Sequence, residues 1–157
     1  MGLNIQVLCI LFRKAVRHHE FLLLKRVPDK GGFWQPVGGG VEDTDGSLLD
    51  AAYREILEET GIARGDISRV IDDVHYFEFD RHYLTGEPID KIKEYVLGFE
   101  VKGSVSVKLE DNPCGEHEDF RWVSFEDSYV MLKWQNNKDG FMKLRQILDS
   151  EDGNHNL

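Results

Sequence analysis

The sequence predicts an α/β fold in which helices pack on a mixed β-sheet. Short apolar runs rich in branched residues stand before and after one strongly amphipathic segment, and a second amphipathic segment lies near the end of the chain. The length of 157 residues fits one domain with a substantial core. We therefore expect a single domain over residues 1–150, followed by a disordered polar tail at 151–157.

The N-terminal part of the chain is expected to form strands joined by turns. Residues 5–12 are an apolar run rich in branched side chains, which is typical of a buried strand, and residues 21–24 form a second run. Residues 28–32 contain Pro and Gly and are expected to form a loop. A short apolar stretch at 33–37 leads into three consecutive glycines at 38–40, which let a backbone turn sharply or approach another group closely.

The segment after the glycines predicts a helix over residues 48–60. Ser47 is suited to be the N-cap, and apolar residues then recur at helical spacing along one face. Gly61 supplies the expected C-terminal stop.

The second half of the chain is expected to add three strands and a closing helix. Residues 70–79 and 94–101 have the composition of longer strands, and the Thr-Gly-Glu-Pro sequence at 85–88 indicates a turn between them. Residues 120–123 are expected to form a last short strand. Apolar residues on one face over 140–148 indicate a C-terminal helix.

Charge and cysteine content restrict the functional classes. A formal net charge of -10 disfavours non-specific nucleic-acid binding, and an acidic enzyme acting on phosphates needs bridging cations. Cys9 and Cys114 have no motif spacing, which argues against a disulfide framework and a zinc site. The longest apolar run, 7–12, is too short to span a bilayer, and no basic segment precedes it. We expect a cytoplasmic protein with no membrane partner.

Three glutamates share one face of the predicted helix. Glu55, Glu58 and Glu59 stand at positions i, i+3 and i+4, and like charges at these spacings destabilise a helix by roughly 0.2–0.5 kcal/mol per pair. A hard divalent cation such as Mg²⁺ relieves this repulsion, because it binds carboxylate oxygens together with substrate phosphates. The alternative interpretation is a solvated acidic face, which is common on surface helices.

The wider segment over residues 38–62, GGGVEDTDGSLLDAAYREILEETGI, resembles the Nudix box. Residues 54–62 match the second half of that pattern at every position, and Gly39 matches its opening glycine. The loop at 42–47 carries one extra residue, so that Asp45 stands in for the first glutamate of the pattern. A match of this length is much more specific than a short glycine motif.

The resemblance implies a Nudix-type α/β/α sandwich around a mixed sheet, and hydrolysis of a nucleoside diphosphate linked to another group. Glu55 and Glu59 correspond to the principal metal ligands, and Glu58 to a further ligand or a water-activating group. Arg54 would orient these carboxylates. The implied cofactor is Mg²⁺, with Mn²⁺ as a substitute, and the implied reaction is attack of water on phosphorus.

Two shorter segments resemble the subgroup that contains dihydroneopterin triphosphate and dNTP pyrophosphatases. They are Phe33-Trp34-Gln35 and Glu116-His117 followed, after four intervening residues, by Trp122. In this subgroup pattern Glu116 would be an additional metal ligand or base, and Arg26 would contact phosphate. The box glycines Gly38 and Gly39 would lie against the substrate.

Each of these residues also has a structural interpretation. Arg26 fits a charged residue at the end of a strand as well as it fits a phosphate contact. Trp34 is better suited to core packing than to base stacking. Glu116 belongs to an acidic loop cluster whose members are all candidates for solvated charges. His117 fits a surface or supporting histidine better than a metal ligand.

The function predicted first is therefore Mg²⁺-dependent hydrolysis of a nucleoside or pterin triphosphate to pyrophosphate and a monophosphate. The second is hydrolysis of a dinucleoside polyphosphate or a nucleotide sugar. The third is a Nudix-fold binding module without catalysis, which the presence of all three helix glutamates disfavours. The expected partner is a small molecule and not a nucleic acid, and the sequence leaves homodimer formation open.

Overall fold

The computed structural model describes residues 4–109 and 115–155, so Cys114 lies outside the described residues. Seven strands form one mixed sheet, and three α-helices pack against it. The strands are β1 Ile5–Lys14, β2 His19–Arg26, β3 Trp34–Gln35, β4 Val37–Gly40, β5 Ile67–Arg81, β6 Pro88–Val101 and β7 His117–Val123. The helices are α1 Leu48–Thr60, α2 Phe125–Met131 and α3 Gln135–His155, and two short 3-10 turns span Pro28–Lys30 and Arg64–Asp66.

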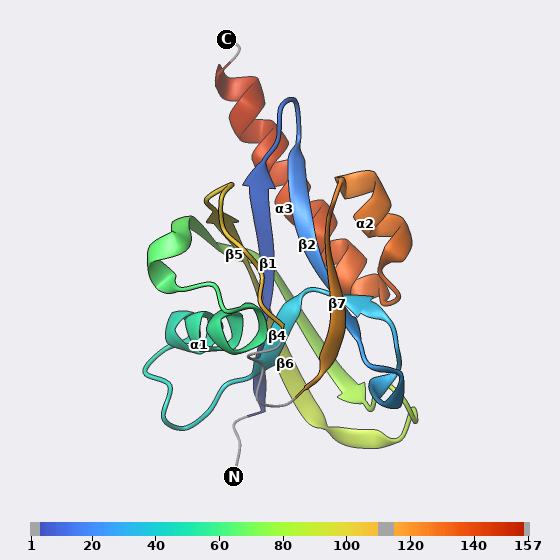
Figure 1. Cartoon of the computed structure of the whole chain (residues 1–157). Coiled ribbons are helices and arrows are strands. Elements are labelled where there is room, and N and C mark those ends of the chain that lie inside the picture. Colours follow the sequence, from blue (N-terminus) through green and yellow to red (C-terminus); the bar gives the residue numbers. More distant parts are fainter. Residues whose placement is uncertain (1–3, 110–114, 156–157) are drawn as a thin grey trace.

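The helices lie in two layers on opposite faces of the sheet (Figure 1). One apolar cluster joins α1 to side chains such as Val7 and Phe99, and the other joins α2 and α3 to side chains such as Leu8 and Val96. Neighbouring strand residues belong to different clusters because successive side chains point to opposite faces. This arrangement confirms the predicted α/β/α sandwich. None of the helices within the described residues is long and apolar enough to cross a membrane.

The predicted central helix is confirmed residue by residue. α1 begins after Ser47, whose hydroxyl accepts a hydrogen bond of 3.0 Å from the backbone N–H of Asp50. It ends at Gly61, which has φ 74° and donates its N–H to the carbonyl of Leu57. These local signals fix the rotation of α1, and with it the direction of the glutamate face.

The glycine triplet forms an extended strand and not a sharp turn. β4 pairs antiparallel with β1, so that Gly38, Gly39 and Gly40 stand opposite Leu8, Val7 and Gln6. The second expectation for the glycines, a close approach, is confirmed. A Cβ at Gly39 would overlap the carboxylate of Glu55, and one at Gly38 would lie 2.8 Å from the carbonyl oxygen of Val7.

Several predicted boundaries are wrong. β5 and β6 form a hairpin much longer than the expected strands at 70–79 and 94–101, and α2 was not predicted. The last helix begins at Gln135 and continues through His155, so residues 151–155 are helical and not a disordered tail. Its end is held to the sheet because both carboxylate oxygens of Glu151 accept hydrogen bonds of 2.9 Å from Arg69 of β5.

Candidate active site

A cleft of about 890 Å³ opens beside β4, between the end of α1 that carries the glutamates and the start of α3. One end is lined by glycines and acidic side chains, and the other by aromatic rings and a buried carboxyl group. The predicted residues that line it are Arg26, Gly38, Gly39, Arg54, Glu55, Glu58 and Glu116. The structure therefore gathers residues from four separate segments of the sequence at one cavity.

The helix glutamates differ in burial. Glu59 is 3% exposed and accepts a hydrogen bond of 3.0 Å from the backbone N–H of Gly38. Burial raises the pKa of Glu59 well above its usual range, and the charge of Glu55 raises it further. Burial also raises the pKa of Glu55 to about 7. Glu58 is more open, with 42% of its side chain exposed.

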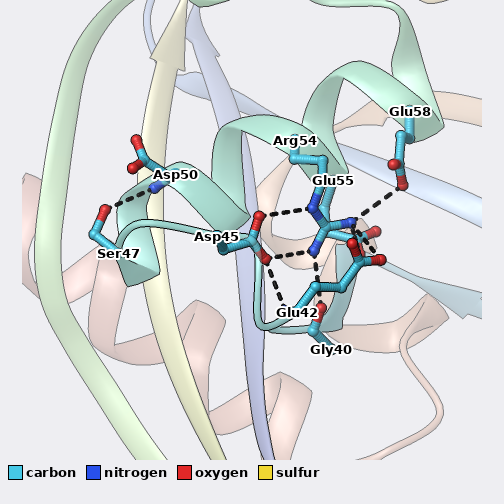
Figure 2. Close-up of polar contacts among 8 residues, drawn as sticks. All are labelled: Gly40, Glu42, Asp45, Ser47, Asp50, Arg54, Glu55 and Glu58. Carbon is cyan, nitrogen blue, oxygen red and sulfur yellow. Dashed lines mark hydrogen bonds and ion pairs between the residues drawn. The ribbon is translucent and has the colours of Figure 1, made fainter. Parts of the chain in front are cut away.

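Arg54 holds the acidic residues around it in place (Figure 2). Its guanidinium donates to both carboxylate oxygens of Asp45, at 2.9 and 2.8 Å, and this pairing lowers the pKa of Asp45. The same group donates to Glu55 at 2.9 Å and to Glu58 at 3.4 Å. Asp45, the substitute in the longer loop, thus anchors the arginine, which in turn positions two helix carboxylates.

Glu116 reaches the same place from the segment directly before β7. The backbone carbonyl of Glu116 accepts the N–H of Val27 at 2.9 Å, which fixes the start of the strand beside the cleft. Ligand atoms of Glu59, Glu116 and His117 all lie within 4.8 Å of one another. Glu118 points elsewhere and pairs with Lys25 at 3.6 Å. The geometry therefore distinguishes Glu116 from its acidic neighbour, although the catalytic role of Glu116 stays a prediction.

His117 is buried, so of the two interpretations given for it, a surface or a supporting histidine, the surface position is wrong. One ring nitrogen lies 2.9 Å from the amide nitrogen of Gln35, and the other has no hydrogen-bond partner among the described residues. Burial lowers the pKa of His117 to about 4, and the positive charges of Arg26 and Lys30 lower it further. The imidazole is therefore neutral at physiological pH.

The acidic end fits a hard divalent cation. Its carboxylate donors come from two segments: Glu55 and Glu59 of α1, and Glu116 directly before β7. Glu55 and Glu116 line the cleft, and Glu59 belongs with Glu116 to the cluster of possible ligand atoms. The negative charge of Glu116 raises the pKa of both α1 glutamates, so the three groups repel one another in the absence of a cation. A divalent cation bound among these carboxylates would relieve the repulsion.

Arg26 and Trp34 occupy different environments. Arg26 lines the cleft, donates to the carbonyl of Lys30 at 3.0 Å and lies 5.7 Å from the ring centre of Phe33. It is therefore placed where a phosphate contact is feasible. Trp34 packs against the apolar cluster under α3, as predicted, with Arg121 5.2 Å from its ring centre.

Sequence reasoning missed the other end of the cleft. Phe77 and Trp134 line it together with Glu94, a carboxyl group that is only 6% exposed. A signal was present, because strand alternation places Glu94 on the same face as Ile92 and the buried Val96. A lone acid on an apolar strand face is a functional candidate.

Fold and site together define an α/β/α enzyme built around helix carboxylates beside a nucleotide-sized cleft. Residues 2–144 match the NUDIX domain, and the chain belongs to the Nudix family of hydrolases.

Curated relatives differ in how much of their length the chain spans. It is 31% identical over 145 residues to a dihydroneopterin triphosphate diphosphatase of Haemophilus influenzae, covering 89% of this chain and 86% of that protein. It is 32% identical over 98 residues to an RNA pyrophosphohydrolase of Francisella philomiragia, covering 59% and 62%. A match of 34% over 118 residues to an octanoyltransferase of Myxococcus xanthus covers 73% of this chain but only 29% of that protein.

Solved structures share the whole fold. A Nudix hydrolase from Listeria monocytogenes is 26% identical, with a TM-score of 0.73, and the match covers 94% of this chain and 96% of that one. An Ap4A hydrolase from Caenorhabditis elegans is 22% identical, with a TM-score of 0.70 and coverage of 93% and 98%. The second similarity concerns the fold alone.

Proposed function

We propose that the protein hydrolyses a phosphoanhydride bond in a nucleoside or pterin triphosphate, in a Mg²⁺-dependent reaction that releases pyrophosphate and the monophosphate. The observation that carries the proposal is that Glu55 and Glu116 line one end of a cleft whose other end is aromatic, with a carboxylate oxygen of Glu59 within 4.8 Å of one of Glu116. A substrate with a polyanionic part and a flat ring matches both ends.

The acidic end divides the chemical roles among its residues. Glu55, Glu59 and Glu116, with Glu58 as a further ligand, would hold the cation, which neutralises phosphate charge and lowers the pKa of water when it is bound. Arg54 keeps Glu55 and Glu58 in position through its hydrogen bonds to both. Glu116 or the more exposed Glu58 accepts the proton of the attacking water.

Substrate phosphates are expected to enter between the glycines and Arg26. Gly38 and Gly39 have no side chains at this point, so a phosphate can approach the β4 backbone closely. Arg26 supplies a positive charge at the same cleft. The remaining phosphate charge requires the cation, since the chain as a whole carries a formal net charge of -10.

The comparisons favour a triphosphate substrate over the alternatives. The relative that is matched over 86% of its length is named a dihydroneopterin triphosphate diphosphatase. Other relatives are named RNA pyrophosphohydrolases, but the strongly negative charge of this chain opposes binding of an RNA polyanion. Hydrolysis of a dinucleoside polyphosphate or nucleotide sugar is the second candidate, supported by the cleft volume of about 890 Å³.

The test is a substrate panel scored by product. Purified protein with Mg²⁺ is given nucleoside triphosphates, dihydroneopterin triphosphate, a dinucleoside tetraphosphate and a nucleotide sugar, and products are separated by ion-exchange chromatography. Pyrophosphate and a monophosphate are expected from a triphosphate. If the dinucleoside tetraphosphate were the only compound cleaved, and gave two nucleotides, hydrolysis of dinucleoside polyphosphates would be the function. No turnover of any compound would indicate a binding module.

Glu116→Gln tests the assignment of the site. We expect kcat to fall by about 10²-fold or more with a smaller change in KM, since Glu116 acts mainly in the transition state. Glu118→Gln is the matched control, because Glu118 lies next but one in sequence and pairs with Lys25 outside the cleft. If the two variants exchanged phenotypes, or if neither lost activity, Glu116 would have no catalytic role.

A further inference from the structure

The end of the cleft away from the α1 glutamates contains a carboxyl group that the proposed phosphate chemistry does not use. Glu94 of β6 is 6% exposed and lines the cleft. The side-chain amide of Asn136, near the start of α3, donates a hydrogen bond of 3.2 Å to Glu94 Oε1. Burying a carboxyl group is unfavourable unless it gains partners, so its presence at a cavity wall points to a ligand that supplies them.

Aromatic side chains line the same cleft as this carboxyl group. Phe77 stands directly opposite Glu94 in the β5–β6 ladder, and its ring centre lies 6.0 Å from that of Phe79. Across the cleft, the rings of Phe33 and Trp134 meet edge to face at 5.5 Å. All four rings line the same cavity. Surfaces of this kind accept a flat heterocycle, whose faces contact the rings while its edge faces the carboxyl group.

Strand register sets the separation between the two ends. Gln6 of β1 stands opposite Gly40 of β4 on one side and opposite Glu94 of β6 on the other. Two strand spacings therefore separate the glycine strand from the backbone of Glu94, a distance of roughly 10 Å. A sugar or a short polyol chain fits between a phosphate at the glycines and a ring at Glu94.

The chemistry of the carboxyl group then selects the ring. A carboxylate only accepts hydrogen bonds, and Asn136 already donates one to Oε1. An edge with two adjacent N–H donors suits the remaining lone pairs. Guanine offers such an edge, with its ring N–H beside an amino group, and pterins have the same 2-amino-4-oxopyrimidine unit. Adenine and cytosine place an acceptor beside their amino group, and uracil flanks its N–H with two carbonyl groups.

We propose that Glu94, oriented by Asn136, binds the donor edge of a 2-amino-4-oxopyrimidine ring, so that the substrate carries guanine or a pterin. The inference rests on the proposed function and narrows its substrate class. Burial raises the pKa of Glu94 to about 7, and two ligand donors would stabilise its ionised form.

Binding without metal tests the proposal independently of catalysis. The probes are GMP, IMP, AMP and neopterin monophosphate, titrated calorimetrically in EDTA at a pH above 7 so that Glu94 is ionised. IMP differs from GMP only by the missing amino group. We expect GMP or neopterin monophosphate to bind at least about tenfold more tightly than IMP and AMP, because a buried acceptor is left unpaired by the last two. The tighter of the first two probes identifies the ring.

Two variants make the result specific. Glu94→Gln should reduce the preference for GMP or neopterin monophosphate over IMP and AMP to less than about threefold. Glu100→Gln should retain the full preference. Glu100 lies on the same strand but pairs with Arg69 at 3.1 Å, and it is not among the described cleft-lining residues. Thermal unfolding of each variant establishes that it is folded. If wild-type protein bound IMP as tightly as GMP and neopterin monophosphate, or if the preference survived in Glu94→Gln, the proposal would be wrong.

Turnover separates this inference from the proposed function. With GTP, dihydroneopterin triphosphate, ITP and ATP as substrates, Glu94→Gln should lower kcat/KM at least about tenfold for the preferred substrate and change it less than about threefold for ATP. A metal-free binding preference without release of pyrophosphate from any substrate would contradict the proposed function and support the base assignment. Equal losses on all four substrates would contradict the base assignment and leave the hydrolytic function intact.

Discussion

Replacing Glu59 by Gln tests whether the charge of this buried carboxylate is required for catalysis. Glu59 is 3% exposed and accepts the N–H of Gly38 at 3.0 Å. Glutamine has almost the same shape, and its amide oxygen can still accept that N–H, so the substitution removes mainly the charge. We expect kcat to fall by at least about 10²-fold, which is the usual cost of removing one group that stabilises transition-state charge.

The same substitution is expected to stabilise the metal-free protein. Burial and the nearby charge of Glu55 both disfavour the ionised form of Glu59, and a neutral amide removes that cost. In EDTA at neutral pH, the free energy of unfolding should be equal to that of the wild type or higher by about 1–3 kcal/mol. Excess Mg²⁺ should stabilise the wild type much more than the variant, because ligand binding to the folded state adds to its stability.

The assays are steady-state pyrophosphate release and urea denaturation followed by tryptophan fluorescence, each with EDTA and with Mg²⁺. Glu118→Gln is the control for removal of one negative charge, since Glu118 is exposed and pairs with Lys25. A kcat within about threefold of the wild type in a folded Glu59→Gln variant would refute the reasoning, because the buried charge of Glu59 would then have no part in catalysis.

Three further predictions concern the metal, the glycine strand and pH. EDTA should abolish turnover and Mg²⁺ or Mn²⁺ should restore it; full activity after exhaustive chelation would exclude the metal site. Gly39→Ala should lower the free energy of unfolding by about 1–3 kcal/mol and reduce activity, because the new methyl group overlaps the Glu55 carboxylate. Gly40→Ala meets nothing within 4 Å and should be close to neutral, so equal effects would exclude a steric cause. Because burial raises the pKa of Glu94 from its ordinary value of 4.5 to about 7, folded protein retains a proton there that unfolded protein releases. The contribution of this group to stability is thus full below pH 4.5 and falls as the pH rises to 7. Urea denaturation in EDTA should therefore show the free energy of unfolding of the wild type falling between these pH values by about 3 kcal/mol more than that of Glu94→Gln. An unchanged pH dependence would show that Glu94 is not perturbed.

The parts of the site that sequence reasoning located depend on local signals. Ser47 and Gly61 determine where α1 begins and ends, and the helical period then places Glu55, Glu58 and Glu59 on one face. The family pattern adds Gly39 before the helix, one residue further away than the pattern has it because of the longer loop at 42–47. None of these inferences needs knowledge of how distant segments pack.

The parts that were missed or wrong depend on contacts between distant segments. α3 extends to His155 because Glu151 pairs with Arg69, which lies 82 residues earlier in the sequence. The burial of His117 follows from its position beside Gln35, also 82 residues away. Glu94 and Asn136 meet only because α3 packs across the strand that carries the acid. Periodicity and composition describe neighbours along the chain and contain no information on these pairings.

The sheet connects both ends of the cleft through one strand. β1 pairs with the glycine strand β4 on one side and, in parallel register, with β6 on the other, so that Gly40, Gln6 and Glu94 form a single row across the sheet. Strand spacing is nearly constant, and the distance from the phosphate end to Glu94 is therefore set by the backbone and not by mobile side chains. Substitutions at Glu94 should consequently change which ring is accepted, whereas substitutions on α1 should change the rate for every substrate alike. A variant of Glu59 that altered base preference, or a variant of Glu94 that slowed all substrates equally, would show that the two ends are not independent.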